Sequence, residues 1–483
     1  MGIADRTVKA AFWMYALNIS TRLLGLVRII ILARLLTPND FGVVAIAMLV
    51  IAGVEVFTRS GLEHSIVQKA EVSRHELHAL WLFDTLRGFA LGVIIFLTAP
   101  YVGAFMNSPG SVAVIRVFSV VPALIFLRNV DMIMIWKELD AKKMVAVEAA
   151  GQIVAVAVGI SMALLSPNVW ALVASVIADR LTQLIMSYIV SRSWPCFVWD
   201  WAVVKYHFRY GRQILAESIG SFFYNTVDDW FVGKFMGEFA LGLYGKAYQF
   251  GNLPTTELTL VLGRVLFPSF SKLKHNISRL GAAFLSVQKV ISLIVAPISV
   301  FLFLFAHPLV YTLLGKQWLS MVPAFQVLVL MGVVRSLRET LGSVFRAVGF
   351  PIIEAYTTFA KLALILALLW PCRSYGIIGV ALLVLLTSLL EFPILMWFAA
   401  RKLDMPYFSI YRPIITPVII ALVSGLITFL VSAGTTGITS LLWGFVGVFG
   451  MYLAIGATLE YVFHLNQFSE IRRIYSLVRL NAG

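Results

Sequence analysis

The chain has 483 residues, of which 60% are hydrophobic and 13% are charged, and its formal net charge is +14. Apolar stretches of about twenty residues, each long enough to cross a hydrocarbon core, run through its whole length, which excludes a soluble protein with one membrane anchor. The surplus of Lys and Arg is expected in loops that face the cytoplasm, so it does not indicate a nucleic-acid partner.

In chain order, the hydropathy pattern predicts an all-α, polytopic membrane protein with about 14 transmembrane helices. The expected spans are residues 10–33, 41–61, 79–101, 112–136, 144–165, 169–190, 212–235, 241–263, 280–305, 321–347, 351–370, 376–398, 410–431 and 438–463. Basic loops alternate with short neutral turns such as 107–110 and 166–168. The positive-inside rule therefore places both termini in the cytoplasm, and the N-terminal run is expected to be retained as the first span.

Two parts of the chain resemble each other at an offset of 200 residues, since Phe41-Gly42 reappears as Leu241-Gly242. Each repeat would hold six spans in one orientation, which predicts two six-helix lobes related by a pseudo-two-fold axis along the membrane normal. The expected division is an N-terminal lobe at 1–191, a cytoplasmic interfacial linker at 192–211, a C-terminal lobe at 212–400, and two additional helices with a basic cytoplasmic tail at 401–483.

The first span contains Arg22 and Arg28. An arginine in hydrocarbon costs roughly 3 kcal/mol even on lenient scales, so we expect both to hold an anion, whose phosphate oxygens a guanidinium grips bidentately. Six residues apart on a straight helix, the two point about 120° away from each other, and a bend at Gly25 would bring them to one side. The alternative is that Arg28 forms an internal ion pair.

Further polar residues in or near the spans are candidates for substrate contact or ion coupling. The second-tier substrate-binding candidates are Arg59, Lys246, Arg264, Arg335, Lys361 and Tyr248. Asp228 aligns with Arg28 at the offset of 200. Together with Asp229 and Glu217, it forms a candidate site for a coupling H⁺ or Na⁺. The alternative is that these carboxylates lie near the outer end of the span and are simply hydrated there. Close spacing on one helix face also predicts three ion pairs, which are Asp84 with Arg87, Arg128 with Asp131, and Glu55 with Arg59.

The motifs resemble those of a known family. Four segments are similar to motifs of the polysaccharide flippases of the multidrug, oligosaccharidyl-lipid and polysaccharide exporter superfamily. They are STRLLGLVR at 20–28, LARLLTPNDFG at 32–42, YGKAY at 244–248 and RVLFPS at 264–269. The resemblance implies two six-helix lobes around a cavity that Arg22 and Arg28 line, and two C-terminal helices. It implies outward transfer of an undecaprenyl-diphosphate-linked oligosaccharide across the bacterial inner membrane for lipopolysaccharide or exopolysaccharide synthesis. A polysaccharide polymerase and chain-length machinery are the candidate partners.

The sequence indicates a transporter and not an enzyme. It contains no G-x-x-x-x-G-K-[ST], G-x-S-x-G or H-E-x-x-H motif, so we expect neither a catalytic site nor a cofactor or metal. Energy would then come from the substrate, the membrane potential or an ion gradient. Two alternatives remain open: a cation-coupled drug or small-molecule antiporter of the same superfamily, and a membrane polysaccharide polymerase or ligase.

Overall fold

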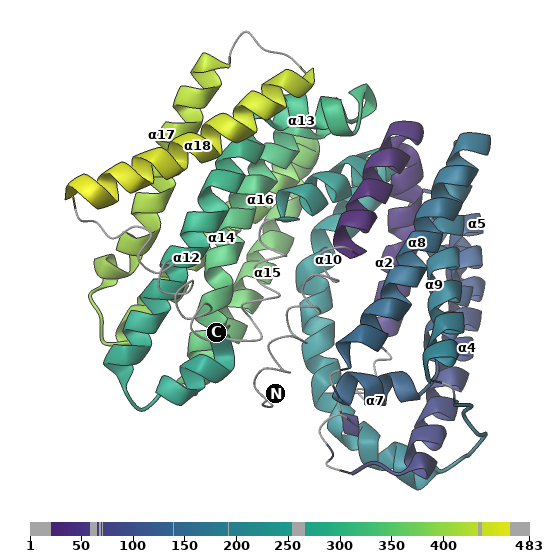
Figure 1. Cartoon of the computed structure of the whole chain (residues 1–483). Coiled ribbons are helices and arrows are strands. Elements are labelled where there is room, and N and C mark those ends of the chain that lie inside the picture. The colour runs from purple at the N-terminus through teal and green to yellow at the C-terminus, as the bar shows by residue number, and fades with distance from the viewer. Residues whose placement is uncertain are drawn as a thin grey trace. The chain divides into compact units, whose positions relative to one another are not determined.

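A computed structural model describes residues 21–57, 65–66, 69, 71–138, 140–191, 193–253, 266–432 and 437–463. All regular structure in these residues is helical. The helices form two compact units, Met1–Gly242 and Leu243–Gly483 (Figure 1). The units divide the chain at a later point than the predicted lobes do, because the helix that follows the linker packs with the first unit up to Gly242.

The helices of the first unit pack side by side along much of their length (Figure 1). They are the helix over residues 21–35, α2 (Pro38–Phe57), α4 (Arg74–Phe105), α5 (Pro109–Phe118), α6 (Val120–Phe126), α7 (Asp131–Lys137), α8 (Ala141–Leu165), α9 (Val169–Ser191) and most of α10 (Trp201–Gly251). Local signals explain where some of them begin. Ser73 opens α4 with a capping box, in which its hydroxyl accepts the N–H of Glu76 while the Glu76 carboxylate accepts the N–H of Ser73.

Residues 112–136 do not form the single span that the hydropathy pattern predicts. The helix is interrupted at Ser119 and again over residues 127–130. Pro122 accounts for the first interruption, because its ring nitrogen cannot donate to the carbonyl one turn earlier. Asn129 shapes the second, since its backbone N–H donates to the hydroxyl of Ser187 on α9 at 3.0 Å.

The predicted span 212–235 and the first part of the predicted span 241–263 fall on α10, and residues 254–263 of the second span lie outside the described residues. The helix α10 is broken at one glycine. Gly237 has φ +88° and ψ 177°, a conformation that residues with a Cβ rarely adopt. The helix begins at Trp201, so the second half of the predicted linker is helical. In that half His207 is fully buried, and its Nδ1 lies 2.7 Å from the hydroxyl of Ser65.

The two repeat glycines meet within the first unit. A Cβ added to Gly42 would lie 1.8 Å from the backbone oxygen of Glu238, and one added to Gly242 would lie 1.9 Å from the backbone oxygen of Pro38. The offset of 200 carries Pro38 to Glu238 and Gly42 to Gly242, so the two contacts exchange roles. Reciprocal contacts of this kind are what a two-fold relation between repeats produces.

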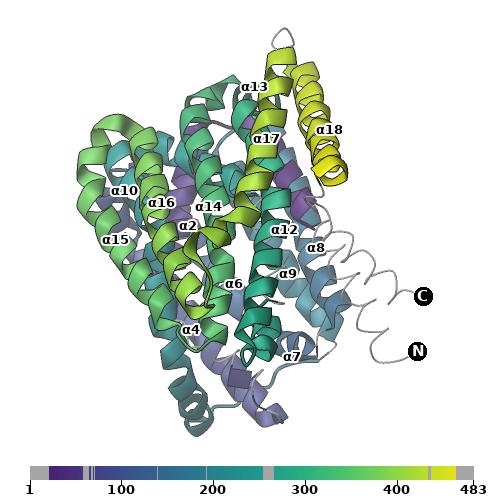
Figure 2. The same ribbon diagram turned by 90° about the vertical axis from the view of Figure 1, so that its left-hand side faces the viewer.

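The second unit is a helical bundle with its own core. It consists of the end of α10, α12 (Ile277–Leu304), α13 (Ala306–Leu313), α14 (Val322–Ala347), α15 (Ile352–Cys372), α16 (Gly376–Lys402), α17 (Arg412–Val431), α18 (Gly437–Phe463) and the 3₁₀ turns η1 (Lys316–Met321), η2 (Arg373–Tyr375) and η3 (Tyr407–Tyr411). Phe284 of α12, Leu341 and Phe345 of α14 and Met396 of α16 lie in one buried apolar cluster. The last two helices, α17 and α18, pack on each other and on α12 (Figure 2).

Ten helical stretches in the described part of the chain are long and apolar enough to cross a membrane, and one of them, Ile352–Lys402, holds both α15 and α16. The described parts of the remaining predicted spans correspond to residues 21–35 and to the two segments of α10. Large apolar side chains are exposed on the helices that are long enough to cross a membrane. On α17, for example, Leu422, Leu426 and Leu430 are 54–65% exposed. Such surfaces suit contact with lipid.

Candidate functional site

Arg28 lies inside the first unit, where it contacts α9. Its Nη1 donates to the hydroxyl of Ser175 at 3.3 Å, and that hydroxyl donates in turn to the carbonyl of Ala155 on α8 at 2.8 Å. Asp179, one turn along α9, attracts the guanidinium electrostatically, whereas Arg180 repels it. The hydrogen bond of Arg28 is thus to a neutral group, and the alternative of an internal ion pair stays a prediction.

The partners of Arg28 belong to a buried polar stripe on α9. Ser175, Asp179, Gln183 and Ser187 follow one another at intervals of four residues, and all four are less than a tenth exposed. Gln183 donates to Asp179 at 2.8 Å, which connects the middle of the stripe. Facing it on α8 is Gly151, at which a Cβ would lie 2.5 Å from the carboxylate of Asp179. A small residue at this position lets the two helices approach closely enough to bury the stripe.

Arg22 lies on the same helix as Arg28 and is half-buried. The helix over residues 21–35 continues through Gly25 without interruption, so the predicted bend is not marked by a break in the helix. Gly25 instead faces α8, where its Cβ position would lie 3.7 Å from Oε1 of Gln152. That Arg22 and Arg28 bind one anion stays a prediction.

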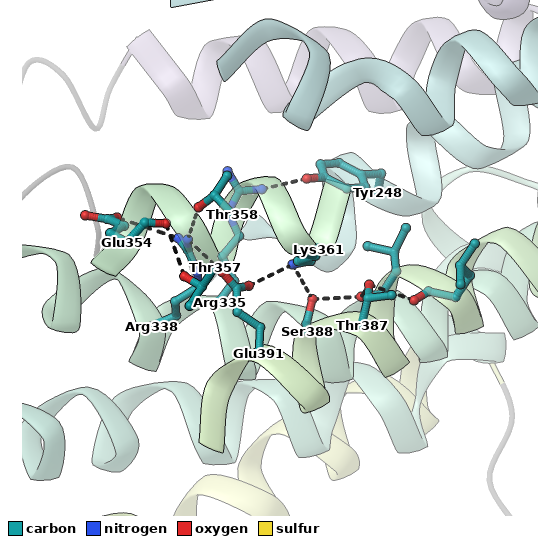
Figure 3. A network of polar contacts seen from close by, with 12 residues as sticks. Tyr248, Arg335, Arg338, Glu354, Thr357, Thr358, Lys361, Thr387, Ser388 and Glu391 are labelled. Carbon is teal, nitrogen blue, oxygen red and sulfur yellow. Dashed lines mark hydrogen bonds and ion pairs between the residues drawn. The ribbon is translucent and has the colours of Figure 1, made fainter. Parts of the chain in front are cut away.

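A second cluster of cations lies in the second unit and brings three predicted residues together (Figure 3). Arg335 of α14 donates to the hydroxyl of Tyr248 at 2.6 Å. Lys361 of α15 is buried, and its Nζ lies 2.8 Å from the hydroxyl of Ser388 and 3.3 Å from Oε2 of Glu391, both on α16. The substrate-binding candidates Tyr248, Arg335 and Lys361 thus lie in one network.

Arg338 holds the centre of this network. Its Nε and Nη2 both lie 3.0 Å from Oε1 of Glu391, and Nη2 also donates to the hydroxyl of Thr358 on α15 at 2.8 Å. Its Nη1 lies 3.9 Å from Glu354, which pairs on its other side with Arg346 at 3.3 Å. One guanidinium therefore connects three helices of the second unit.

Sequence reasoning missed Arg338, Glu354 and Glu391. One signal was available for Glu391, since a carboxylate in an apolar span is costly and marks a functional or paired group. Arg338 could have been found from its spacing, because it lies three residues after Arg335 and so shares its helix face. Their pairing with α15 could not be found this way, because it depends on how the helices pack.

The remaining predicted cations are placed only in part. Lys246 donates to Gln249 of its own helix at 2.9 Å. Arg59 and Arg264 lie outside the described residues, so the Glu55–Arg59 ion pair is untested. A cavity of about 250 Å³ lies between α4, α6, α7 and α8 and includes Trp81 in its lining, but no predicted substrate-binding residue lines it.

The coupling-ion candidates lie on α10. Asp228 is only 5% exposed and Asp229 is half-buried, while the side chain of Glu217 is outside the described part of the structure. The burial of Asp228 argues against the alternative that this carboxylate simply hydrates. Asp228 and Arg28 belong to the same compact unit, because α10 packs with the first unit as far as Gly242. Their predicted placement in the two lobes of the repeat stays a prediction.

Two of the predicted ion pairs can be compared with the structure. Asp84 and Arg87 are 3.1 Å apart, so that pair is confirmed. The pairing of Arg128 with Asp131 is wrong, because Asp131 instead accepts hydrogen bonds from Arg74 and from Ser193. The break over residues 127–130 removes the regular helical spacing on which that prediction depended.

A family model described as "Polysaccharide biosynthesis protein" matches residues 31–323, more than half of the chain. Over 409 residues the chain is 26% identical to the lipopolysaccharide biosynthesis protein WzxC of Escherichia coli K12, which covers 83% of this chain and 82% of that protein. It is 22% identical to the teichuronic acid biosynthesis protein TuaB of Bacillus subtilis, with 90% of each covered. Identity to the succinoglycan biosynthesis transport protein ExoT of Rhizobium meliloti is 23%, with 74% and 76% covered.

Solved structures show the same architecture. The lipid II flippase MurJ in an inward closed conformation superposes with a TM-score of 0.72 at 14% identity, covering 93% of this chain and 99% of that one. An inward-facing multidrug resistance transporter of the MATE family gives a TM-score of 0.58 at 15% identity, with 79% and 95% covered. At this level of identity the likeness shows the fold, and it confirms the predicted fold class of an all-α, polytopic membrane protein.

Proposed function

Because the chain belongs to the family of polysaccharide biosynthesis proteins, we propose that it is a flippase for undecaprenyl-diphosphate-linked oligosaccharides. It carries repeat units from the cytoplasmic to the outer face of the inner membrane by alternating access, for lipopolysaccharide or exopolysaccharide synthesis. The names of its relatives support this role: WzxC and TuaB act in surface-polymer biosynthesis, ExoT is called a transport protein, and the structurally similar MurJ is a lipid II flippase.

The observation that carries the proposal is the gathering of cations and hydroxyls on the apolar helices of the second unit. Arg335, Arg338 and Lys361 lie beside the hydroxyls of Tyr248 and Thr358 (Figure 3). A sugar diphosphate cannot cross hydrocarbon unaided, because its charges and hydroxyls lose their hydration there. Guanidinium groups match phosphate oxygens, and hydroxyls can replace water around sugars. Arg22 and Arg28 supply further positive charge in the first unit.

The same observation weighs against the two alternatives. A drug or cation antiporter would be expected to present acidic groups to its cationic ligand, whereas the described part of the buried network in the second unit contains Arg335, Arg338 and Lys361 beside Glu391. A polymerase or ligase would need a large outer loop for its catalytic residues. The connection between the predicted spans 280–305 and 321–347 is short, and its residues 307–320 form most of α13 and of η1.

The chain is a multi-pass protein of the inner membrane, and we place both termini and the basic loops in the cytoplasm on the positive-inside rule. A polysaccharide polymerase and chain-length machinery are the proposed partners, because a flipped repeat unit must be polymerised outside. An anion leaving an inside-negative cell gains roughly 2.3 kcal/mol per charge per 100 mV, so the potential favours export. A coupling H⁺ or Na⁺ at Asp228 and Asp229 would add a second driving force.

Transport in reconstituted vesicles tests the proposal. The wild type should move a labelled lipid-linked oligosaccharide between leaflets, Arg22→Ala and Arg28→Ala should each lose most of this transport, and Arg28→Lys should keep part of it, since Lys retains the charge without the fork. Arg401→Ala, which removes an exposed cation at the end of α16, should behave as the wild type. Normal transport by both Ala variants, at equal protein level, would exclude these arginines from the site, and its absence in the wild type would exclude the function.

Coupling is tested separately by replacing Asp228 and Asp229 together with Asn. If they bind the coupling ion, transport should respond less to an imposed pH or sodium gradient, while binding of the lipid diphosphate stays nearly unchanged. An unchanged gradient response would exclude this pair as the coupling site.

A further inference from the structure

Glu391 occupies a position that suits a phosphate. Its Oε1 receives the fork of Arg338, and its Oε2 faces the ammonium group of Lys361 at 3.3 Å. Two kinds of cation from two helices thus converge on one anion. A guanidinium fork, an ammonium and neighbouring hydroxyls are the donor set that proteins use for phosphate.

The carboxylate satisfies this site incompletely. The buried Oε2 of Glu391 accepts no hydrogen bond from the described residues, although the ammonium group of Lys361 lies 3.3 Å away. Among the described residues of the network, the cations are Arg335, Arg338, Arg346 and Lys361 and the carboxylates are Glu354 and Glu391. A diphosphate diester carries two negative charges and more acceptor oxygens than a carboxylate, so it would fill the site more completely.

The network also leads from the surface of the second unit to its interior. Side-chain exposure falls from 48% at Arg346 to 25% at Glu354, 11% at Arg338, 7% at Lys361 and 3% at Glu391. Cations and carboxylates alternate along this path, and its cations are Arg346, Arg338 and Lys361. The network is therefore a continuous chain of ion pairs that runs from an exposed cation to a buried carboxylate.

The helix that carries Glu391 is weakened where it would have to move. Pro393 lies inside α16 two residues after Glu391 and cannot donate to the carbonyl one turn earlier. Thr387 and Ser388 donate to carbonyls of their own helix at 2.8 and 2.7 Å, an arrangement that bends helices. These features together allow α16 to bend at the turn that holds the carboxylate.

We propose that Arg338 and Lys361 form a diphosphate-binding site that Glu391 occupies while the ligand is absent. The ligand displaces the carboxylate and frees α16 from α14 and α15, and the returning carboxylate competes with the bound diphosphate and promotes its release. Competition of this kind lowers affinity in favour of turnover. The inference rests on the proposed function, because it names the part of the chain that would hold the lipid diphosphate.

Binding to the full chain in lipid nanodiscs tests the displacement, with geranyl diphosphate as a soluble isoprenyl diphosphate probe. Glu391→Gln removes the competing charge and keeps the shape, so affinity should rise about tenfold, within the usual range of coupling between two ligands. Adding Arg338→Gln to this variant should abolish the gain. The matched control is Asp84→Asn, which removes a buried, ion-paired carboxylate of the first unit and should leave affinity unchanged.

Three further arms separate the sources of the anion. Inorganic diphosphate should compete with the probe, whereas phosphatidylglycerol in the nanodisc and geraniol without phosphate should not. Displacement by phosphatidylglycerol alone would identify the site as one for ordinary anionic lipid and overturn the proposal. Equal or weaker probe binding by folded Glu391→Gln would also overturn it and show that Glu391 is a structural clamp.

A measurement on the wild type covers the case in which Glu391→Gln does not fold. Amide hydrogen exchange in residues 388–395 should quicken when geranyl diphosphate binds, because the ion pairs that hold this turn are released. Unchanged or slower exchange with bound probe would contradict the displacement. The inference fails and the proposed function stands if the oligosaccharide is flipped by the wild type, but neither the rise in affinity of Glu391→Gln nor the faster exchange in 388–395 is seen. A wild type that binds no isoprenyl diphosphate and transports no oligosaccharide excludes both the inference and the proposed function.

Discussion

The contact between Gly42 and Gly242 makes Gly42→Ala a strong test of the repeat. A Cβ at Gly42 would lie 1.8 Å from the backbone oxygen of Glu238 and 2.5 Å from its carbonyl carbon, whereas ordinary contact begins at 3.4 Å. The difference, 3.4 minus 1.8, means that α2 and this part of α10 must separate by about 1.6 Å. Backbone atoms cannot swing aside as the end of a side chain can.

The expected effect is a balance of two terms. Replacing a helical glycine by alanine stabilises a helix by about 1 kcal/mol, whereas overpacking a close contact costs about 1–3 kcal/mol or more. At Gly42 the second term should win, so the melting temperature of the purified protein should fall. Gly450→Ala is the matched control, because that glycine lies in α18 with nothing within 4 Å of its Cβ position, and it should raise the melting temperature slightly.

Reciprocity adds a sharper criterion. Gly242→Ala presses on the backbone of Pro38 at 1.9 Å, so it should destabilise the protein about as much as Gly42→Ala does. Once one substitution has separated the helices, the second costs little more, and the double variant should lose much less than the sum of the single losses. Additive losses, or a Gly42→Ala variant as stable as Gly450→Ala, would refute the reasoning.

Two further predictions concern orientation and pH. Single cysteines in 107–110 should react with an impermeant thiol reagent in intact cells and those in 272–279 should not, because basic loops stay in the cytoplasm; labelling at 272–279 would contradict this orientation. His207 lies before the predicted span 212–235, and burial lowers the pKa of its imidazole. The charge of nearby Glu76 opposes this lowering of the pKa, and the charge of nearby Lys69 adds to it. The neutral ring is thus the stable form, so its contribution to stability is present above the ordinary pKa of 6.5 and is lost as the pH falls below it. The melting temperature of His207→Phe should therefore depend less on pH between about 7.5 and 5.5 than that of the wild type, and equal slopes would count against this account.

The sequence was most informative where a pattern is local. Apolar stretches of membrane-spanning length predicted the class of protein, and the motifs from 20 to 42 predicted its family. The Asp84–Arg87 pair could be predicted because residues three apart share one helix face. The break before Pro122 had a local signal too, which the hydropathy of the stretch 112–136 concealed.

Partners set by helix packing could not be predicted. Asp131 pairs with Arg74, 57 positions away, and not with the nearby Arg128. Lys361 meets Glu391 across α15 and α16, a contact that depends on the rotation of both helices about their axes. The repeat identified Gly42 and Gly242 as equivalent positions, but nothing in their spacing predicted that both would lie at the close contact between α2 and α10.

The two cationic clusters limit the cost of buried charge in different ways, and this difference decides how variants should be interpreted. Arg28 donates to a neutral hydroxyl with a carboxylate one turn away, so its replacement by Ala leaves no carboxylate that has lost a direct hydrogen-bonded partner. Arg338 and Lys361 hold Glu391 directly, so removing one of them leaves a buried carboxylate short of positive charge and can destabilise the fold by about 3–5 kcal/mol. Loss of transport in a Lys361 variant therefore reports on binding only after the amount of folded protein has been measured, whereas loss in an Arg28 variant at normal protein level points directly to the anion.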